Sequence, residues 1–217
     1  MILKAQMTNF VLTSINLTEM ARIKIEKNLS RKDVIVNKAA TLFREKGYKA
    51  ASMRDLAEAV GVEAASLYNH IKSKSELLHE LVFSVANKFV MKLDEIESES
   101  ITSLQKMEKI LRFHISEMIH HYEEVYVSDR EWKHLSDPYL SNYQNQRRVY
   151  RKRLAAIIEE GIRNKEIKAI DAPTVVLIFL HAVSGIESWH RSTKKISAEE
   201  LEQNMVAILI DGLKANK

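Results

Sequence analysis

The chain has 217 residues but no cysteine, only two prolines and only five glycines. Without cysteine it forms neither a disulfide nor a thiolate metal site, which suits a reducing cytoplasm. A β-rich or α/β protein of this length needs more turn-forming residues than these. We therefore expect an all-α fold, and apolar residues that recur at three- and four-residue spacing agree with it.

Long apolar runs are also missing. None reaches the roughly 18–20 residues that a membrane-spanning helix needs. The longest run, 175–183, contains His181 and is interpreted as part of a buried helix. The first 21 residues lack the ordered basic, apolar and small-residue segments of a signal peptide. We predict a cytoplasmic protein with no membrane partner and an N-terminal extension over residues 1–29.

Apolar periodicity and capping residues predict about nine helices. Their expected ranges are 30–46, 52–60, 64–70, 73–93, 102–122, 124–135, 138–165, 172–191 and 197–214. The expected capping boxes pair Ser52 with Asp55, Ser73 with Glu76 and Ser197 with Glu200. The sequence shows neither internal repeats nor low-complexity tracts.

Positive charge is concentrated near the N-terminal end of the predicted helices. Residues 22–74 contain twelve Lys or Arg and six Asp or Glu, whereas residues 1–21 balance. Because the whole chain carries +4, residues 75–217 carry a small negative excess. A local basic surplus favours contact with phosphates, although solvated helices also vary in charge by this much.

The segment Ser52–Lys74 predicts two short helices joined by a turn at Gly61. Two such helices are what many proteins use to place one helix in the major groove of DNA. Leu67 and Ile71 are the expected buried anchors, so the small and polar side chains around them face outward. On spacing alone, an ordinary helical hairpin within a bundle remains the alternative.

Side chains that can hold phosphates or read bases gather in this segment. Tyrosine, histidine and lysine can bind phosphate oxygens, and asparagine and arginine can reach base edges. Small residues let the backbone approach the groove. The predicted DNA-binding residues are Ser52, Arg54, Ala64, Ala65, Ser66, Tyr68, Asn69, His70, Lys72 and Lys74.

From about Arg31 to Leu81 the sequence resembles the TetR family of bacterial transcriptional regulators. The run AATLFREKGYKAASMRDLAEAVGVEAASLYNHIKSKSELLHEL carries the likeness. The matching positions are Leu42, Phe43, Gly47, Tyr48, Ser52, Leu56, Ala57, Gly61, Val62, Ser66, Leu67, Tyr68, His70, Ser73, Lys74 and Leu77. The resemblance implies an N-terminal, three-helix DNA-binding domain of the helix-turn-helix type, over residues 30–75.

This chain departs from the family pattern at the start of the second short helix. Glu63, Ala64 and Ala65 stand where the family usually has Ser or Thr, Lys and a small residue, and Ile71 replaces an aromatic. An acid near DNA is repelled by phosphates. Glu63 either accepts a hydrogen bond from a cytosine amino group or caps the helix, and we favour the cap.

The resemblance also implies a larger C-terminal helical domain, over residues 76–217, that binds a small ligand and forms a homodimer. The last two predicted helices carry broad apolar faces suited to that dimer, although they could instead only fill a monomer core. A closed two-fold dimer would place two reading helices about one DNA turn apart, which suits a palindromic operator in double-stranded DNA.

From Trp132 onward the chain loosely resembles a TetR subgroup that senses acyl-CoA thioesters. The likeness rests on EWKHL, QRRVYRKRL, EEGIRNKEI and SGIESWHR. Arginines on the helix 138–165 would meet the anionic head of such an effector, and aromatic side chains would line its apolar tail. The predicted ligand-binding residues are Trp132, Arg147, Tyr150, Arg151, Phe179 and Trp189, with Arg148 and Arg153 as further candidates. A solvated arginine face and an aromatic core are the alternative.

His114, Glu117 and His121 fall near one face of the predicted helix 102–122, which leaves a helical metal-binding protein or enzyme as an alternative. Pocket or exposed polar side chains explain them equally. We find neither a phosphate-cradling glycine loop nor a nucleophile elbow. We therefore predict no enzyme and no cofactor, but a ligand-controlled repressor; a purely structural helical protein is a further alternative.

Overall fold

The computed structural model describes residues 30–194 and 196–215, which form helices, turns and one isolated bridge between Ile167 and Lys214. The predicted all-α fold is confirmed. The helices are α2 (Arg31–Lys46), α3 (Met53–Val60), α4 (Ala64–Leu67), α5 (Lys74–Ser98), α6 (Ser103–His120), α7 (Tyr122–Arg130), the 3₁₀ helix η1 (Trp132–His134), α8 (Tyr139–Arg163), α9 (Ala172–Ser184), α10 (Ile186–Arg191) and α11 (Ala198–Asp211). The predicted extension lies outside the described residues.

Each of the nine predicted helices has a counterpart, but several differ in extent. The range 64–70 is helical only over Ala64–Leu67 and continues in turns, and the range 73–93 extends to Ser98 as α5. The range 172–191 is divided into α9 and α10 at Gly185, whose amide donates to the carbonyls of both His181 and Ala182. The range 124–135 becomes α7, which begins at Tyr122, followed by η1. The shared hydrogen bonds of Gly185 tighten the chain locally, so the apolar periodicity of residues 172–191 continues although the helix is divided there.

The capping boxes explain where several helices begin. At Ser52 both halves form: the hydroxyl accepts the amide of Asp55, and the Asp55 carboxylate accepts the amide of Ser52. At Ser73 only the serine half forms, because the Glu76 carboxylate accepts the amide of Lys72 instead, at 2.7 Å. The reciprocal half of that predicted box is therefore wrong, because the longer side chain of glutamate reaches one residue further back. The predicted box at Ser197 likewise forms only its serine half, in which the hydroxyl accepts the amide of Glu200.

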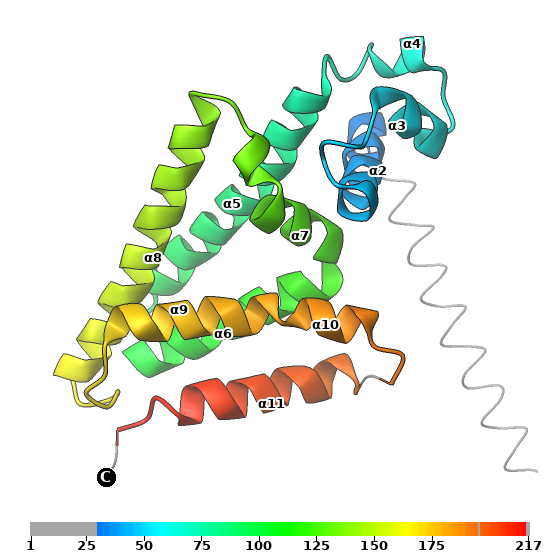
Figure 1. The fold of residues 1–217 in the computed structure, drawn as a ribbon. Coiled ribbons are helices and arrows are strands. Elements are labelled where there is room, and N and C mark those ends of the chain that lie inside the picture. Colours follow the sequence, from blue (N-terminus) through cyan, green and yellow to red (C-terminus); the bar gives the residue numbers. More distant parts are fainter. Residues whose placement is uncertain (1–29, 195, 216–217) are drawn as a thin grey trace, which may run out of the picture.

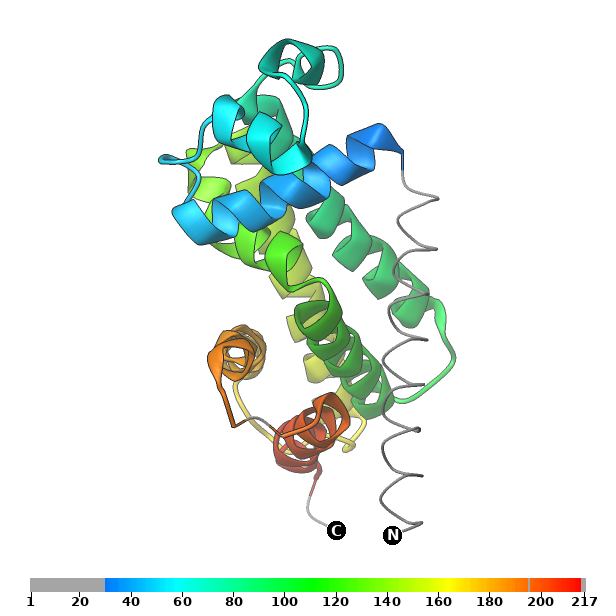
Figure 2. The same ribbon diagram turned by 90° about the vertical axis from the view of Figure 1, so that its right-hand side faces the viewer.

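Two buried cores lie at opposite ends of the molecule. The first joins α2, α3 and α4 to the first half of α5 and to Val127, Leu135 and Tyr143. The second joins the end of α5 to α6, α8, α9, α10 and α11. Figures 1 and 2 show α3 and α4 at one end and α11 at the other. Helix α5 contributes to both cores, and the predicted domain boundary at 75/76 falls in its first turn.

The segment Ala172–Arg191 is apolar enough, by length and composition, to cross a membrane, with a mean hydropathy of 1.3. Its inner face, Val175, Val176, Phe179 and Val183, lies in the second core. Its outer face exposes Leu177 and Ile178 to 56% and 53%. The apolar residues of Ala172–Arg191 therefore fill the second core on one side of the helix and lie exposed on the other.

Candidate functional site

The DNA-facing candidate is the pair α3 and α4 with the turn between them. Gly61 ends α3 in the left-handed conformation (φ 77°, ψ 36°), and its amide donates to the carbonyls of Ala57 and Glu58. Glycine adopts this conformation without the cost that a Cβ brings. Beyond α4, the backbone continues in tight turns to Ile71, which is fully buried like Leu67. A short helix is thereby held on two apolar anchors.

The structure leaves most of the predicted DNA-binding side chains facing solvent. The exposed ones are Ser52, Arg54, Ala64, Ala65, Tyr68, Asn69, His70 and Lys72, while Ser66 and Lys74 are half-buried. Glu63 is the residue before α4, yet its side chain makes no capping hydrogen bond. Glu63 therefore holds the N-cap position that we favoured for it through its backbone carbonyl alone, and its carboxylate lies exposed at the helix start.

Lys74 differs from Lys72 in its surroundings. Its ammonium donates to the carbonyls of Tyr48 at 2.9 Å and Ala51 at 2.8 Å. It also lies 4.5 Å from the centre of the Tyr48 ring, a cation–π distance. Lys74 thus ties the α2–α3 connection to the start of α5. Among the described residues, the ammonium of Lys72 has no hydrogen-bond partner.

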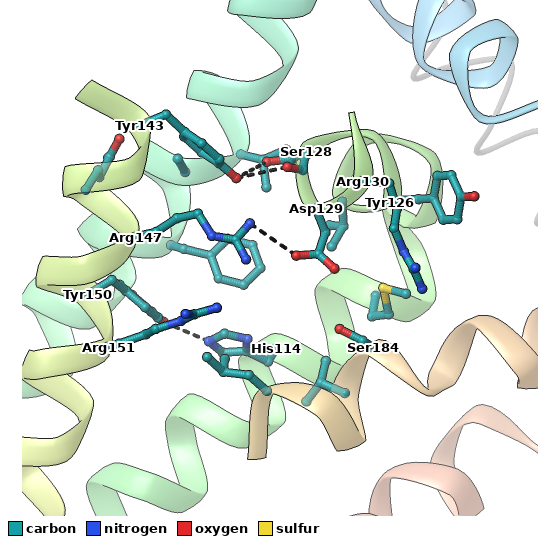
Figure 3. A pocket seen from close by; sticks show the side chains of 18 of the residues that line it. His114, Tyr126, Ser128, Asp129, Arg130, Tyr143, Arg147, Tyr150, Arg151 and Ser184 are labelled. Carbon is teal, nitrogen blue, oxygen red and sulfur yellow. Dashed lines mark hydrogen bonds and ion pairs between the residues drawn. The ribbon is translucent and has the colours of Figure 1, made fainter. Parts of the chain in front are cut away.

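The ligand-facing candidate is a cavity of about 350 Å³ bounded by α5, α6, α7, α8, α9 and α10. One part of its wall is apolar: Val85, Ala86, Phe89, Val90, Met118, Val125, Leu180 and Val183. Figure 3 shows the polar part, with Arg147, Tyr150 and Arg151 on α8 facing Asp129 and Arg130 on α7 and His114 on α6. The pocket therefore combines an apolar surface with several convergent polar groups, as ligand sites usually do.

Two ion pairs join α7 to its neighbours along this pocket. Arg147 on α8 lies 3.2 Å from the Asp129 carboxylate, and its guanidinium stacks near Trp132, 5.4 Å from the ring centre. Arg130 lies 2.9 Å from Glu187 on α10. Arg151 has no ion-pair partner in the part of the chain that the structure describes. An anion entering the pocket would find one unpaired arginine and two that are already engaged.

Of the predicted ligand-binding residues, the pocket brings together Arg147, Tyr150 and Arg151. Phe179 is fully buried in the second core behind His114, and the indole of Trp189 donates to the carbonyl of Ile196, so neither lines the cavity. The remaining candidates also lie elsewhere: Trp132 flanks Arg147, Arg148 donates to Asn145, and Arg153 pairs with Asp94 and Glu97 on α5. Arginines four residues apart on a helix share a face, whereas their neighbours turn away.

The predicted metal candidates are not arranged as a metal site. His114 is buried against Tyr150, Glu117 lies 2.6 Å from the Lys88 ammonium, and His121 is exposed between α6 and α7. Within residues 30–194 and 196–215, no group of three or more His, Cys, Asp or Glu is placed to hold a metal ion. The shared helix face does not bring the three side chains to one point.

Asp129, Arg130 and Glu187 are pocket residues that sequence reasoning missed. The run SDREW lies within the predicted helix 124–135 and carries no pocket signal of its own, and Glu187 lies 57 residues beyond its partner Arg130. A local signal existed only for Arg147 and Arg151, because helical spacing places them on one face. The pairing of the others depends on how α7 and α10 pack.

Comparison with known proteins adds two family matches. Residues 35–81 match the family of bacterial regulatory proteins called tetR, and residues 100–213 match the tetracyclin repressor-like C-terminal domain. The HTH-type transcriptional repressor KstR2 of Mycolicibacterium smegmatis is 26% identical over 186 residues, covering 85% of this chain and 91% of the relative. The Staphylococcus aureus regulator IcaR, which acts negatively on the biofilm operon icaADBC, is 29% identical over 167 residues, covering 73% and 82%.

Solved structures share the fold. The ketosteroid transcriptional regulator KstR2 of Mycobacterium tuberculosis superposes with a TM-score of 0.80 at 23% identity, covering 86% of this chain and 96% of that one. AibR, solved in complex with isovaleryl coenzyme A and operator DNA, superposes with a TM-score of 0.74 at 22% identity, covering 83% and 98%. Both likenesses concern the arrangement of helices.

Proposed function

The chain belongs to the TetR family of bacterial regulatory proteins, and on this premise we propose that it is a cytoplasmic, dimeric repressor whose operator binding is released by an acyl-CoA. Its curated relatives are transcriptional repressors. The observation that carries the proposal is one chain that combines an exposed helix-turn-helix, within a basic N-terminal region, with a pocket lined by apolar and arginine side chains.

The DNA-binding part is proposed to use the exposed side chains of α3, α4 and the turn after α4. Lys72 and Tyr68 would contact phosphates, and Arg54 and Asn69 would reach base edges. Ser52, Ala64, Ala65, Ser66 and His70 complete the proposed contact surface. For Lys74, predicted from the sequence as a phosphate contact, we propose a positioning role for the reading helices instead, because its ammonium donates to the carbonyls of Tyr48 and Ala51.

The dimer is proposed to form through α9, α10 and α11. Leu177 and Ile178 on α9 and Ile208 on α11 are large apolar side chains with more than half of their surface exposed, Ile208 to 73%. Covering them with a second copy would remove this apolar surface from water. Because a two-fold axis repeats the reading helix, the operator should be palindromic.

The effector is proposed to place its acyl chain against the apolar wall and its anionic head toward Arg147 and Arg151. A cavity of about 350 Å³ lies near the lower end of the roughly 300–1,000 Å³ usual for ligand pockets, so it suits the acyl part of the molecule. Support comes from the fold shared with AibR, which was solved with isovaleryl coenzyme A.

Release of DNA is proposed to pass through α7. One side of this helix carries Asp129 and Arg130 at the pocket, and Val127 lies in the core shared with α2 and α5. At its start, Glu123 pairs with Arg44 of α2 at 3.7 Å. An anionic effector that competes for Arg147 would loosen the Arg147–Asp129 pair, and its differential affinity for the two arrangements would set the extent of release.

The test is fluorescence anisotropy of the purified full-length protein with labelled DNA from upstream of its own coding sequence. We expect affinity to fall by on the order of 100-fold between 50 and 200 mM salt, as several phosphate contacts require. A fragment of equal length from within the coding sequence is the control. Equal affinity for both fragments, or affinity without salt dependence, would contradict the repressor function.

A second measurement adds octanoyl-CoA, or free CoA as a control, to the preformed DNA complex. We expect octanoyl-CoA to release the DNA and the variant Arg151→Met, which breaks no ion pair among the described residues, to keep DNA affinity but weaken the response. Native mass spectrometry of the purified protein would report the dimer and any retained acyl-CoA. Salt-dependent DNA binding without any acyl-CoA response would contradict only the effector class.

A further inference from the structure

His114 and Tyr150 form a hydrogen-bonded pair in the wall of the pocket. The Nε2 atom of His114 on α6 lies 2.7 Å from the hydroxyl oxygen of Tyr150 on α8. Both residues line the cavity, and Figure 3 shows the imidazole directed toward the hydroxyl. Only 5% of His114 is exposed. The pair therefore adds neutral polar atoms to the polar part of the pocket wall, beside the arginines of α8.

Aromatic rings enclose this pair and keep it uncharged. The His114 ring meets the edges of Phe89 at 4.6 Å and Phe179 at 5.6 Å between ring centres. Burial lowers the pKa of His114 to about 3 and raises the pKa of the Tyr150 hydroxyl well above its ordinary value. At neutral pH an imidazole and a phenol, both neutral, face each other.

The hydrogen-bonding capacity of the pair is not used up. A neutral imidazole has one N–H and one acceptor nitrogen, and the phenol adds one O–H. Their mutual hydrogen bond consumes one of the two hydrogens. The described residues offer no third partner, so one hydrogen stays available, on the Tyr150 hydroxyl or on Nδ1 of His114.

Other polar side chains of the pocket contrast with this pair. The Tyr143 hydroxyl donates to the carbonyl of Ser128 at 2.9 Å, and Arg147 pairs with Asp129. Those groups are satisfied within the protein. A buried donor without a partner costs about 1–3 kcal/mol, so a ligand atom that accepts the free hydrogen would stabilise the His114–Tyr150 pair.

We propose that His114 and Tyr150 together form a specificity site that takes a neutral carbonyl group carried within an otherwise apolar ligand. A carboxylate there would lose its hydration among aromatic rings without a counter-charge from the pair, whereas a ketone or thioester carbonyl needs one donor only. The proposal rests on the proposed function in one respect: the cavity is the effector site. The thioester of an acyl-CoA is one source of such a carbonyl.

The test uses two fragments of nearly equal shape, cyclohexanone and methylenecyclohexane, which differ in carrying C=O or C=CH₂. Binding is followed in the full-length protein by the ¹⁵N resonances of its histidine rings. In the wild type, cyclohexanone should cause a saturable shift of the His114 ring nitrogens that methylenecyclohexane does not cause. This arm needs no variant, so it stands even if a substitution impairs folding.

The matched variant is Tyr150→Phe, which removes one oxygen from the pair. We expect it to weaken cyclohexanone binding by about tenfold and to leave methylenecyclohexane within about twofold. Equal effects on both fragments would show a purely structural link between α6 and α8 and overturn the proposal. It is also overturned if neither fragment shifts His114, or if cyclohexanecarboxylate binds at His114 more tightly than the ketone.

A parallel arm compares octanoyl-CoA with its thioether analogue S-octyl-CoA, again with Tyr150→Phe. If neither CoA compound binds while the ketone effect holds, the proposed effector class fails and the carbonyl site stands. If both bind equally and the variant changes neither, the carbonyl site is overturned and the acyl-CoA response stands.

Discussion

The helix-turn-helix segment and the ligand pocket differ in how far along the chain their contacts reach. Around α3 and α4, the capping and backbone hydrogen bonds join residues three to five positions apart, as between Ser52 and Asp55. In the pocket, His114 meets Tyr150 across 36 residues and Arg130 meets Glu187 across 57. The DNA-facing shape is therefore encoded locally, whereas the pocket exists only after several helices have packed.

Lys74 is a long-range exception among the contacts at the DNA-facing end. Lys74 reaches back 23 and 26 residues to the carbonyls of Ala51 and Tyr48. Val127 and Tyr143, from the pocket side, complete the core beneath α2 and α4. The locally encoded helix-turn-helix thus packs on residues of α7 and α8 that the rest of the chain provides. We propose that a change in the pocket reaches the DNA-binding helices through this contact.

The largest expected effect follows from Leu67→Ala, which would break the anchor of α4. Leu67 is fully buried, so its truncation should cost about 3 kcal/mol of unfolding free energy. Urea unfolding measures this cost, and DNA affinity should fall more than effector affinity. Met91→Ala, at a side chain 69% exposed, is the control and should change stability by less than about 0.5 kcal/mol. Equal loss of both affinities would show that the two regions are not separable.

The next effect concerns the pocket and pH. The pKa of His114 is about 3 in the folded protein because of burial, below its ordinary value of 6.5. Between these values the unfolded chain binds more protons, so the stability from neutral His114 is complete above pH 6.5 and declines as pH falls toward 3. Relative to His114→Phe, the wild type should lose about 2 kcal/mol between pH 7 and pH 5. Urea unfolding of both proteins at both pH values measures this loss. Equal losses of unfolding free energy in the wild type and in His114→Phe would contradict a buried, neutral His114.

A smaller effect distinguishes two kinds of glycine. A Cβ at Gly161 would lie 2.6 Å from the Cδ1 atom of Ile167, so Gly161→Ala should cost about 1–2 kcal/mol through crowding. Ile167→Val removes that Cδ1 atom, and the double variant should recover part of the loss. Gly61→Ala should cost about 1 kcal/mol through its positive φ. No neighbouring substitution should relieve it. Thermal unfolding of the single and double variants measures these costs. If the stability loss of the double variant equals the sum of the losses of Gly161→Ala and Ile167→Val, crowding by Ile167 is refuted.

The smallest effect separates two lysines at the DNA end. Lys72→Met should weaken DNA binding a few-fold and lower the slope of log affinity against log salt by about 1, because one phosphate is no longer neutralised. Lys74→Met should lower the unfolding free energy by about 1 kcal/mol and leave the slope unchanged, because its ammonium binds carbonyls. Anisotropy titrations over a salt series measure both slopes. A reduced slope for Lys74→Met would assign that lysine to a phosphate after all.

Much of the fold could be predicted because its signals are short-range. Ser30, Ser52, Thr102 and Asp171 cap the helices that they precede. The pocket was predicted only in part: Arg147, Tyr150 and Arg151 share a helix face, whereas Phe179 and Trp189 were assigned from residue type alone. Aromatic side chains fill a core and line a cavity equally well, so their type did not separate the two.

The sequence alone determined the all-α fold, the turn at Gly61 and the likeness of residues 31–81 to the TetR family, because helical period, capping and positive φ are local properties. Only the tertiary structure decided that Lys74 holds a backbone connection, that the Glu63 side chain makes no capping hydrogen bond, and that His114 contacts Tyr150 and no metal-binding neighbour. Each of those outcomes depends on which distant helix faces a side chain, and that is set by packing.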